Sequence, residues 1–325
     1  MDTIGIGFGM LMAFFLGVAH AQDDPRLHPG ELRVVDVTRA GLKEIVPGAV
    51  YMRHWFGTHQ STALFEFPAS AGSDTGLALH SHGSEMAVQM VGDSSIVDER
   101  GRHYPVRQGD VILVKANVRH TGTFGANANR ILSVVTPPRP EYADEDGNAY
   151  FPGHGQPAVA AASARPADAG SAVRTLFNLQ NVEASLLPVG SDSLAFRHWH
   201  GQDVSVAVTR LRVGQTGHLR AAHAVHGEEV TFLLRGTMTL TQGDGAVLTA
   251  HAGQLVMLPP YRAHSAACLT DDCLLLSWHT PRRDEWGAEG SLPDVRFAST
   301  GGGAVTGAAY AGCPCQQGQP GKQQQ

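Results

Sequence analysis

The sequence predicts an all-β protein built from two tandem copies of one small β-barrel or β-sandwich domain. Three observations carry this prediction. The chain matches itself at an offset of 144 residues, its apolar runs are only as long as strands, and its 38 Gly and 18 Pro favour turns over long helices. A length of 325 residues suits two domains, and 42% hydrophobic residues suffice for their cores.

The first residues predict a secretory signal peptide, residues 1–21. Residues 4–18 are apolar or Gly, and the run ends at Ala19-His20-Ala21, which has the form of an A-x-A cleavage signal. The run is short for a membrane span, and a retained anchor is the alternative. Export predicts a periplasmic or secreted protein in an oxidising compartment. There Cys268 and Cys273, which flank a predicted hairpin tip, can form a disulfide.

The internal repeat sets the domain boundaries. We expect a first domain at 31–142, an Ala/Pro-rich linker at 143–172, a second domain at 173–287 and a Gly/Gln-rich tail at 288–325 that contains Cys313 and Cys315. The residues of the first copy that recur unchanged in the second include Arg53, His54, Trp55, Gly57, His82, Gly83, Glu85, Gly92, Gly109, His120, Ser133, Thr136, Pro137, Arg139 and Glu141.

Short apolar or β-branched runs between turn signals predict the strands of each copy. These runs are 87–91, 111–114 and 131–135 in the first copy, and 230–234, 238–240, 255–258 and 274–277 in the second.

Metal-ligand residue types gather in the first copy. His80 and His82 are two residues apart, so on a strand they project from the same face. Glu85 is an odd step further and faces inward only if the chain bends at Gly83, a glycine that recurs at the matching place in copy two. His120 arrives from a later strand. Three imidazoles and one carboxylate suit a mononuclear divalent transition metal, namely Fe, Mn, Ni, Co, Cu or Zn.

These residues resemble the two sequence motifs of the cupins. The matching segments are Glu85-x6-Gly92, Gly109-x5-Lys115-x-Asn117-x2-His120, Glu229-x6-Gly236 and Gly253-x5-Pro259-x-Tyr261-x2-His264. The resemblance implies a bicupin with two double-stranded β-helix (jelly-roll) barrels, each with a metal inside. Lys115 and Asn117 stand where the cupin motif has Pro and Gly, and the final Asn of the motif is absent.

The second copy has a depleted ligand set. Ala224 replaces the counterpart of His80, and the neighbouring His223 faces the other side of a regular strand. The expected ligands here are His226, Glu229 and His264, with His223 as a further ligand only if the strand bulges. A vestigial barrel kept for packing is the alternative.

Each copy ends in a Pro- and Arg-containing segment, which in copy one runs from Thr136 through Arg139. This ending resembles that of a small-cupin subgroup with uronate ring-opening enzymes and the bacilysin-pathway isomerase. Arg139 would hold a substrate carboxylate, and a structural salt bridge is the alternative. The repeated Arg53-His54-Trp55 either lines the pocket or places its Trp in the core.

Together these features predict an exported, metal-dependent enzyme acting on a small oxygen-rich, carboxylated compound. Arg139 and Glu85 are the expected catalytic residues, and the chemistry is that of an isomerase or lyase, or of a dioxygenase. A net charge of -6 without a Lys/Arg run argues against nucleic acid as a partner. We expect a small-molecule substrate, no membrane association after signal cleavage, and a possible homo-oligomer. The alternative is a bicupin that binds a metal or a sugar acid without turnover.

Overall fold

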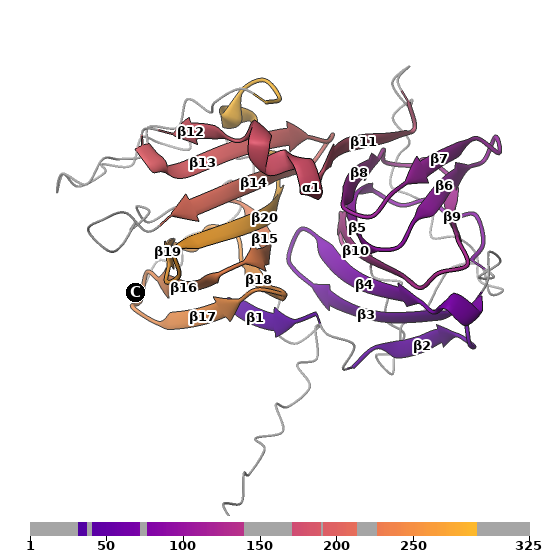
Figure 1. Cartoon of the computed structure of the whole chain (residues 1–325), viewed down its shortest axis with the longest axis horizontal. Coiled ribbons are helices and arrows are strands. Elements are labelled where there is room, and N and C mark those ends of the chain that lie inside the picture. The colour runs from indigo at the N-terminus through magenta and orange to yellow at the C-terminus, as the bar shows by residue number, and fades with distance from the viewer. Residues whose placement is uncertain are drawn as a thin grey trace, which may run out of the picture.

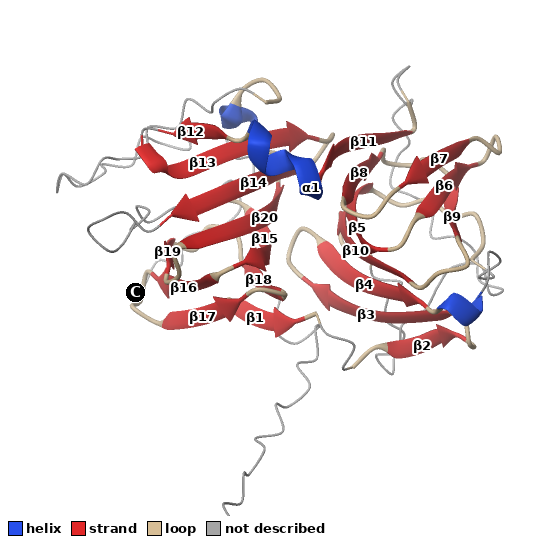
Figure 2. Ribbon diagram, viewed as in Figure 1, coloured by secondary structure: helices blue, strands red, loops and turns tan. Residues whose placement is uncertain are grey.

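The computed structural model describes residues 32–37, 41–71, 77–139, 171–189, 191–212 and 226–290. Nearly all elements in these ranges are β-strands, which form two barrels side by side (Figures 1 and 2). The predicted all-β class is confirmed, and each predicted strand run lies within an observed strand. The predicted signal peptide, most of the predicted linker and tail, His223 and Ala224, and Cys313 and Cys315 lie outside the described residues.

The first barrel combines a seven-stranded sheet, in the order β11-β8-β5-β10-β4-β3-β2, with a three-stranded sheet, β7-β6-β9. Neighbouring strands are antiparallel. The elements are β2 (Lys43–Val46), β3 (Val50–Phe56), β4 (Ser61–Phe67), η1 (Ala69–Ala71), β5 (Ser84–Val91), β6 (Ser94–Asp98), β7 (His103–Val106), β8 (Asp110–Val114), β9 (His120–Phe124), β10 (Asn129–Thr136) and β11 (Val173–Asn178).

The second barrel repeats this plan with the sheets β1-β18-β15-β20-β14-β13-β12 and β17-β16-β19. Its elements are β1 (Arg33–Asp36), α1 (Leu179–Val182), η3 (Glu183–Ser185), β12 (Leu187–Val189), β13 (Ser191–His200), β14 (Ser205–Arg212), β15 (Glu228–Arg235), β16 (Thr237–Gln242), β17 (Val247–His251), β18 (Gln254–Leu258), β19 (His264–Cys268), β20 (Asp272–Thr280) and η4 (Asp284–Trp286). In the described part of the chain, no helix has the length and hydrophobicity to span a membrane.

The two barrels exchange edge strands. β1 precedes the first barrel in sequence but pairs with β18 of the second, with Arg33 opposite Met257 (Figure 1). In the same way, β11 precedes the second barrel but pairs with β8 of the first. Each large sheet therefore ends in a strand that the neighbouring half of the chain supplies.

A single apolar core lies between the barrels. It contains Trp55 and Trp199, the aromatic residues of the repeated Arg/His/Trp motif, together with Trp278. Phe177 of β11 stacks on Trp199 with ring centroids 3.8 Å apart. The two tryptophans of the motif therefore belong to the core, which resolves the alternatives that the sequence left open. Burial of such aromatic area contributes strongly to stability and couples the two barrels.

The predicted disulfide is present. Cys268 at the end of β19 and Cys273 in β20 are bonded across the turn that joins these strands. Both cysteines are buried in the second barrel.

Candidate metal centres

Three imidazoles meet at one end of the first barrel. His80 and His82 lie just before β5, and His120 begins β9. The backbone pairs His80 with His120 through two hydrogen bonds, of 3.0 Å from the His80 N–H and 2.8 Å from the His120 N–H. One ring nitrogen from each of the three histidines lies within 4.8 Å of the others. The sequence-predicted histidines are thus brought together.

Each of these rings is oriented by the backbone. The Nδ1 atoms of His80, His82 and His120 lie 3.0, 2.9 and 2.9 Å from the carbonyl oxygens of Ala78, Gly83 and Val118. Nδ1 therefore carries the proton, and Nε2 keeps its lone pair for a ligand. Burial lowers the pKa of His80 and His82, which favours the neutral form that a metal needs.

Glu85 joins the cluster because the chain bends at Gly83. A Cβ at Gly83 would lie 2.0 Å from the backbone oxygen of Thr136, so only glycine fits this bend. Glu85 Oε2 then lies 3.2 Å from His82 Nε2 and 3.5 Å from His120 Nε2. Ser133 donates a hydrogen bond to the other carboxylate oxygen of Glu85.

The charge state of Glu85 follows from these contacts. Burial raises the pKa of Glu85, but the imidazoles of His120 and His82 outweigh burial and hold this pKa well below its usual range. They do so while an Nε2 proton lies between ring and carboxylate, and a bound metal ion would take the place of that proton. Glu85 is therefore a carboxylate. Three neutral nitrogens and one anionic oxygen form a donor set that fits a divalent transition metal.

A left-handed residue fixes the loop before His120. Asn117 has φ 63°, where the cupin motif has Gly, and its N–H donates to the His82 carbonyl at 2.8 Å. Tyr261 in copy two has φ 61° and donates to the His226 carbonyl at 2.7 Å. In both repeats, the backbone N–H of this left-handed residue therefore holds the loop before the last histidine against the histidine at the bend.

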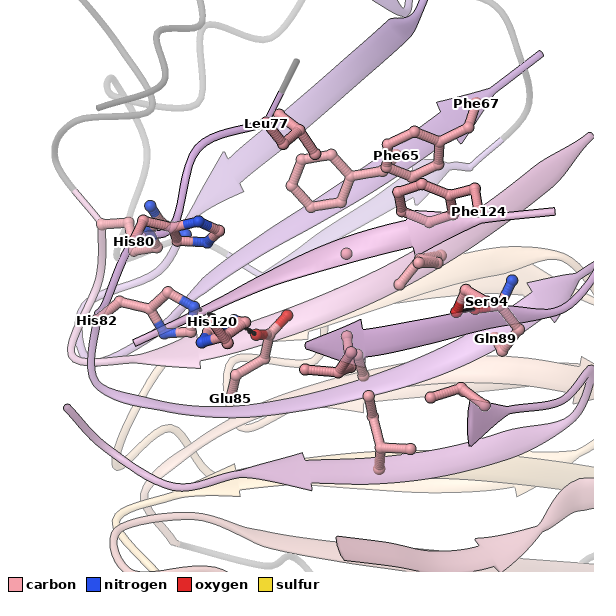
Figure 3. Close-up of a pocket in the computed structure, with 17 residues that line it drawn as sticks. Phe65, Phe67, Leu77, His80, His82, Glu85, Gln89, Ser94, His120 and Phe124 are labelled. Carbon is pink, nitrogen blue, oxygen red and sulfur yellow. Dashed lines mark hydrogen bonds and ion pairs between the residues drawn. The ribbon is translucent and has the colours of Figure 1, made fainter. Parts of the chain in front are cut away.

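A cavity of about 70 Å³ opens beside the first cluster (Figure 3). Arg139, which is only 3% exposed, lines it together with the ligand residues. Most of the remaining wall is apolar, and Phe67 stacks on Phe124 at 3.6 Å between centroids. The cavity therefore has a charged end at the ligands and an apolar body.

The far end of this cavity is polar. Figure 3 shows Gln89 and Ser94 at the opposite side from the histidines. Gln89 Nε2 donates to the carbonyl of Val91 at 2.8 Å and to Asn129 Oδ1 at 2.9 Å, while Ser94 donates to Gln89 Oε1 at 2.8 Å. Because these donors are already used, the two side chains offer only acceptor lone pairs to the cavity. Sequence reasoning missed this end.

The second barrel brings His226, Glu229 and His264 together. One ligand atom from each lies within 4.8 Å of the others. His226 Nε2 is 3.1 Å from Glu229 Oε2 and 3.2 Å from His264 Nε2. The Nδ1 atoms of both histidines lie against backbone carbonyls, at 2.7 and 2.9 Å, so Nε2 of each ring faces the cluster here too.

Three features separate the second site from the first. His279 of β20, which the sequence analysis did not select, is buried beside Glu229, with its Nε2 3.9 Å from Glu229 Oε1. The counterpart of Gln89 is Leu233 and that of Ser94 is Met238; both are fully buried in an apolar cluster. The counterpart of Arg139, Arg283, instead stacks on Trp286 at 5.0 Å.

Solved structures with a similar fold include two oxalate decarboxylases. A variant of the Bacillus subtilis enzyme with one tryptophan replaced by tyrosine is 13% identical with a TM-score of 0.51, covering 76% of this chain and 77% of that one. The Lactobacillus farciminis enzyme, in a formate complex, is 14% identical with a TM-score of 0.50, covering 76% and 86%. A Leptotrichia buccalis cupin 2 conserved barrel domain protein is 12% identical with a TM-score of 0.49, covering 76% and 96%. No protein-family model matches the sequence, and no curated protein is significantly similar to it. The likeness to the two oxalate decarboxylases shows the fold, a pair of all-β barrels, as the resemblance to the cupin motifs predicted.

Proposed function

We propose that the first barrel is the active site of a metal-dependent enzyme that acts on a small carboxylated compound. The observation that carries this proposal is the convergence of three backbone-oriented imidazoles and the Glu85 carboxylate at the head of a cavity that also contains Arg139. The donors would be His80, His82, Glu85 and His120. A metal held there would supply Lewis-acid chemistry to a substrate oxygen.

The chain's own residues have separate roles in this proposal. Arg139 presents a guanidinium at the cavity wall and can bind a substrate carboxylate through two parallel hydrogen bonds. Ser133 holds the Glu85 carboxylate in place. Phe65, Phe67 and Phe124 exclude water from the body of the cavity, which strengthens the electrostatic interactions inside it. The apolar body favours a substrate with its carboxylate at the metal end, and the acceptors of Gln89 and Ser94 suit a hydroxyl at its other end.

Isomerase or lyase chemistry is the leading reaction class. The buried arginine beside the ligands supports it, and so does the fold shared with oxalate decarboxylases, enzymes of a small dicarboxylate. Manganese is the first metal to test, because the Bacillus subtilis enzyme has Mn(II) centres. Dioxygenase chemistry is the second candidate, which the three-histidine, one-glutamate donor set supports.

The decisive experiment combines metal analysis with a substrate screen. Elemental mass spectrometry would measure metal per chain in the wild type and in His80→Ala, with His103→Ala as an exposed-histidine control. A panel of short carboxylates beginning with oxalate would be tested for turnover, with and without oxygen-uptake measurement. We expect His80→Ala to lose first-barrel metal and turnover together. If His80→Ala contained as much metal as the wild type, the proposal would be overturned. Carboxylate binding without turnover would favour the binding-protein alternative.

We further propose that the protein is exported. The A-x-A signal at Ala19-His20-Ala21 and the Cys268–Cys273 disulfide support export, since disulfides persist in oxidising compartments. N-terminal sequencing of the protein from fractionated cells would test it. A mature chain that begins at Gln22 is expected, and an uncleaved cytosolic chain would contradict export.

A further inference from the structure

The second barrel has lost one histidine and gained another. Ala224 stands where the first copy has His80, so this barrel lacks the first ligand of the repeated set. His279, however, stands where the first copy has Val135. The exchange replaces an imidazole on the segment before β15 with an imidazole on β20.

The sheet register places His279 on the ligand face. In the antiparallel pair β15 and β20, His279 lies directly opposite Glu229. Directly opposed residues project from the same face of a sheet, so both side chains point into the barrel. The ring of His279 is 5.2 Å from that of His226 between centroids, and its Nε2 is 3.9 Å from Glu229 Oε1.

The Nε2 atom of His279 lies on the side of the carboxylate without a hydrogen bond to it. The residue is 5% exposed, and its Nε2 is 3.9 Å from Glu229 Oε1, which is too long for a hydrogen bond. Burial of an imidazole costs free energy that a bound metal at Nε2 would offset. Trp286 packs edge-on against this ring at 4.8 Å and holds it beside the cluster.

The spacing of the donor atoms agrees with a shared ion. Donors about 2.1 Å from one metal lie about 3.0–3.4 Å apart, depending on whether the geometry is octahedral or tetrahedral. The observed separations from His226 Nε2 are 3.1 Å to Glu229 Oε2 and 3.2 Å to His264 Nε2. At 3.9 Å from Glu229 Oε1, His279 Nε2 needs only a small shift to join them.

The wall behind this cluster is apolar. Leu233 and Met238, which replace the polar pair Gln89 and Ser94 of the first cavity, are 0% and 1% exposed and belong to a buried apolar cluster. A set of four protein donors in front of an apolar wall, with no polar pair behind it to bind a substrate, has the character of a structural metal site.

We propose that the second barrel holds a closed, structural metal centre of the zinc type, in which His279 is the fourth ligand beside His226, Glu229 and His264. The first barrel binds substrate at an open centre, whereas this centre stabilises the fold. The proposal does not depend on the activity proposed for the first barrel.

The test uses the full chain with the first centre disabled by His82→Ala and His120→Ala. In this background, Zn²⁺ per chain, Zn²⁺ affinity by competition with a chelator, and thermal melting with Zn²⁺ or EDTA are measured. His279→Val, which installs the residue found in copy one, is compared with His251→Val at an exposed histidine. We expect about one Zn²⁺ per chain in the background and in His251→Val, and at least a tenfold weaker affinity in His279→Val.

The EDTA measurement separates ligation from packing. If His279 is a ligand, His279→Val melts no lower than the background in EDTA and loses the stabilisation by Zn²⁺. A lower melting temperature in EDTA with unchanged Zn²⁺ affinity would overturn the proposal and make His279 a packing residue. A background that binds no Zn²⁺ would overturn it as well. Co²⁺ substitution gives a third readout, because the visible spectrum of the bound ion changes when one imidazole is removed.

Discussion

Replacement of Gly83 by alanine is expected to dismantle the first metal centre while leaving the second intact. The new Cβ would lie 2.0 Å from the Thr136 backbone oxygen and 2.6 Å from the Pro137 ring. Neither neighbour is the end of a flexible side chain, so the backbone must move by about 1 Å or more, at an overpacking cost of about 1–3 kcal/mol. For a chain of this size we expect the melting temperature to fall by about 3–10 °C.

The displacement acts on the ligands on both sides of the bend. His82 precedes Gly83 directly and Glu85 follows it by two residues, so a shift of about 1 Å pulls both away from His120 and lowers metal affinity at least tenfold. The matched control is Gly125→Ala, whose Cβ would meet only the Asp93 backbone oxygen at 3.7 Å, an ordinary contact. Elemental mass spectrometry and calorimetry of both variants provide the assay. If Gly83→Ala keeps its full metal content and melts at the same temperature as Gly125→Ala, the steric account of the bend is refuted.

Three further outcomes are expected. Burial raises the pKa of Glu228 to about 7, so this carboxyl favours folding when protonated; its contribution is complete below its ordinary pKa of 4.5 and is lost as the pH rises through about 7. Between pH 5 and pH 8, the free energy of unfolding of the metal-free protein, measured with denaturant, should therefore fall by up to about 3 kcal/mol more than that of Glu228→Gln. Parallel pH profiles of the two proteins would contradict this. Reduction of Cys268–Cys273, or Cys268→Ser with Cys273→Ser, should cost about 2 kcal/mol by loop entropy, because the bonded residues are only 5 apart in sequence; unchanged unfolding curves would argue against it. The double variant Gln89→Leu, Ser94→Met carries the residues of copy two at the far end of the cavity. It should abolish the binding of carboxylates that carry a terminal hydroxyl, measured by isothermal titration, and leave the metal content unchanged. Retained binding would place the ligand elsewhere.

The sequence supports prediction of the features that recur at the 144-residue offset. Gly83 and Gly227 are repeated before the carboxylates, and both would clash with a backbone oxygen if they carried a Cβ. The odd spacing of Glu85 requires a bend in the chain, and the repeated glycine marks the position of that bend in the sequence. Strand runs and histidine spacing are local signals of the same kind, because a period of two residues determines which side chains share a face.

Features that depend on pairing between distant segments could not be predicted in this way. His279 faces Glu229 only through the register of β15 and β20, and its repeat partner, Val135, gives no hint of a ligand. The polar end of the first cavity needs β5, β6 and β10 to meet, which brings Gln89 and Ser94 together with Asn129. A closer comparison of the two copies would have found one signal, since Gln89 and Ser94 change to Leu233 and Met238.

The exchanged strand β1 has a consequence for how the protein is made. Arg33 and its partner Met257 are 224 residues apart, so at a synthesis rate of about 5–20 residues per second β1 emerges roughly 10–45 seconds before β18 exists. The first described strand to be translated is thus among the last to be paired. Until then Val34 and Val35 are unpaired, and the length of only four residues limits the pairing of this strand with other chains. The order of synthesis and the order of assembly are therefore opposed for β1, and completion of the second barrel waits until β18 and β20 have been made.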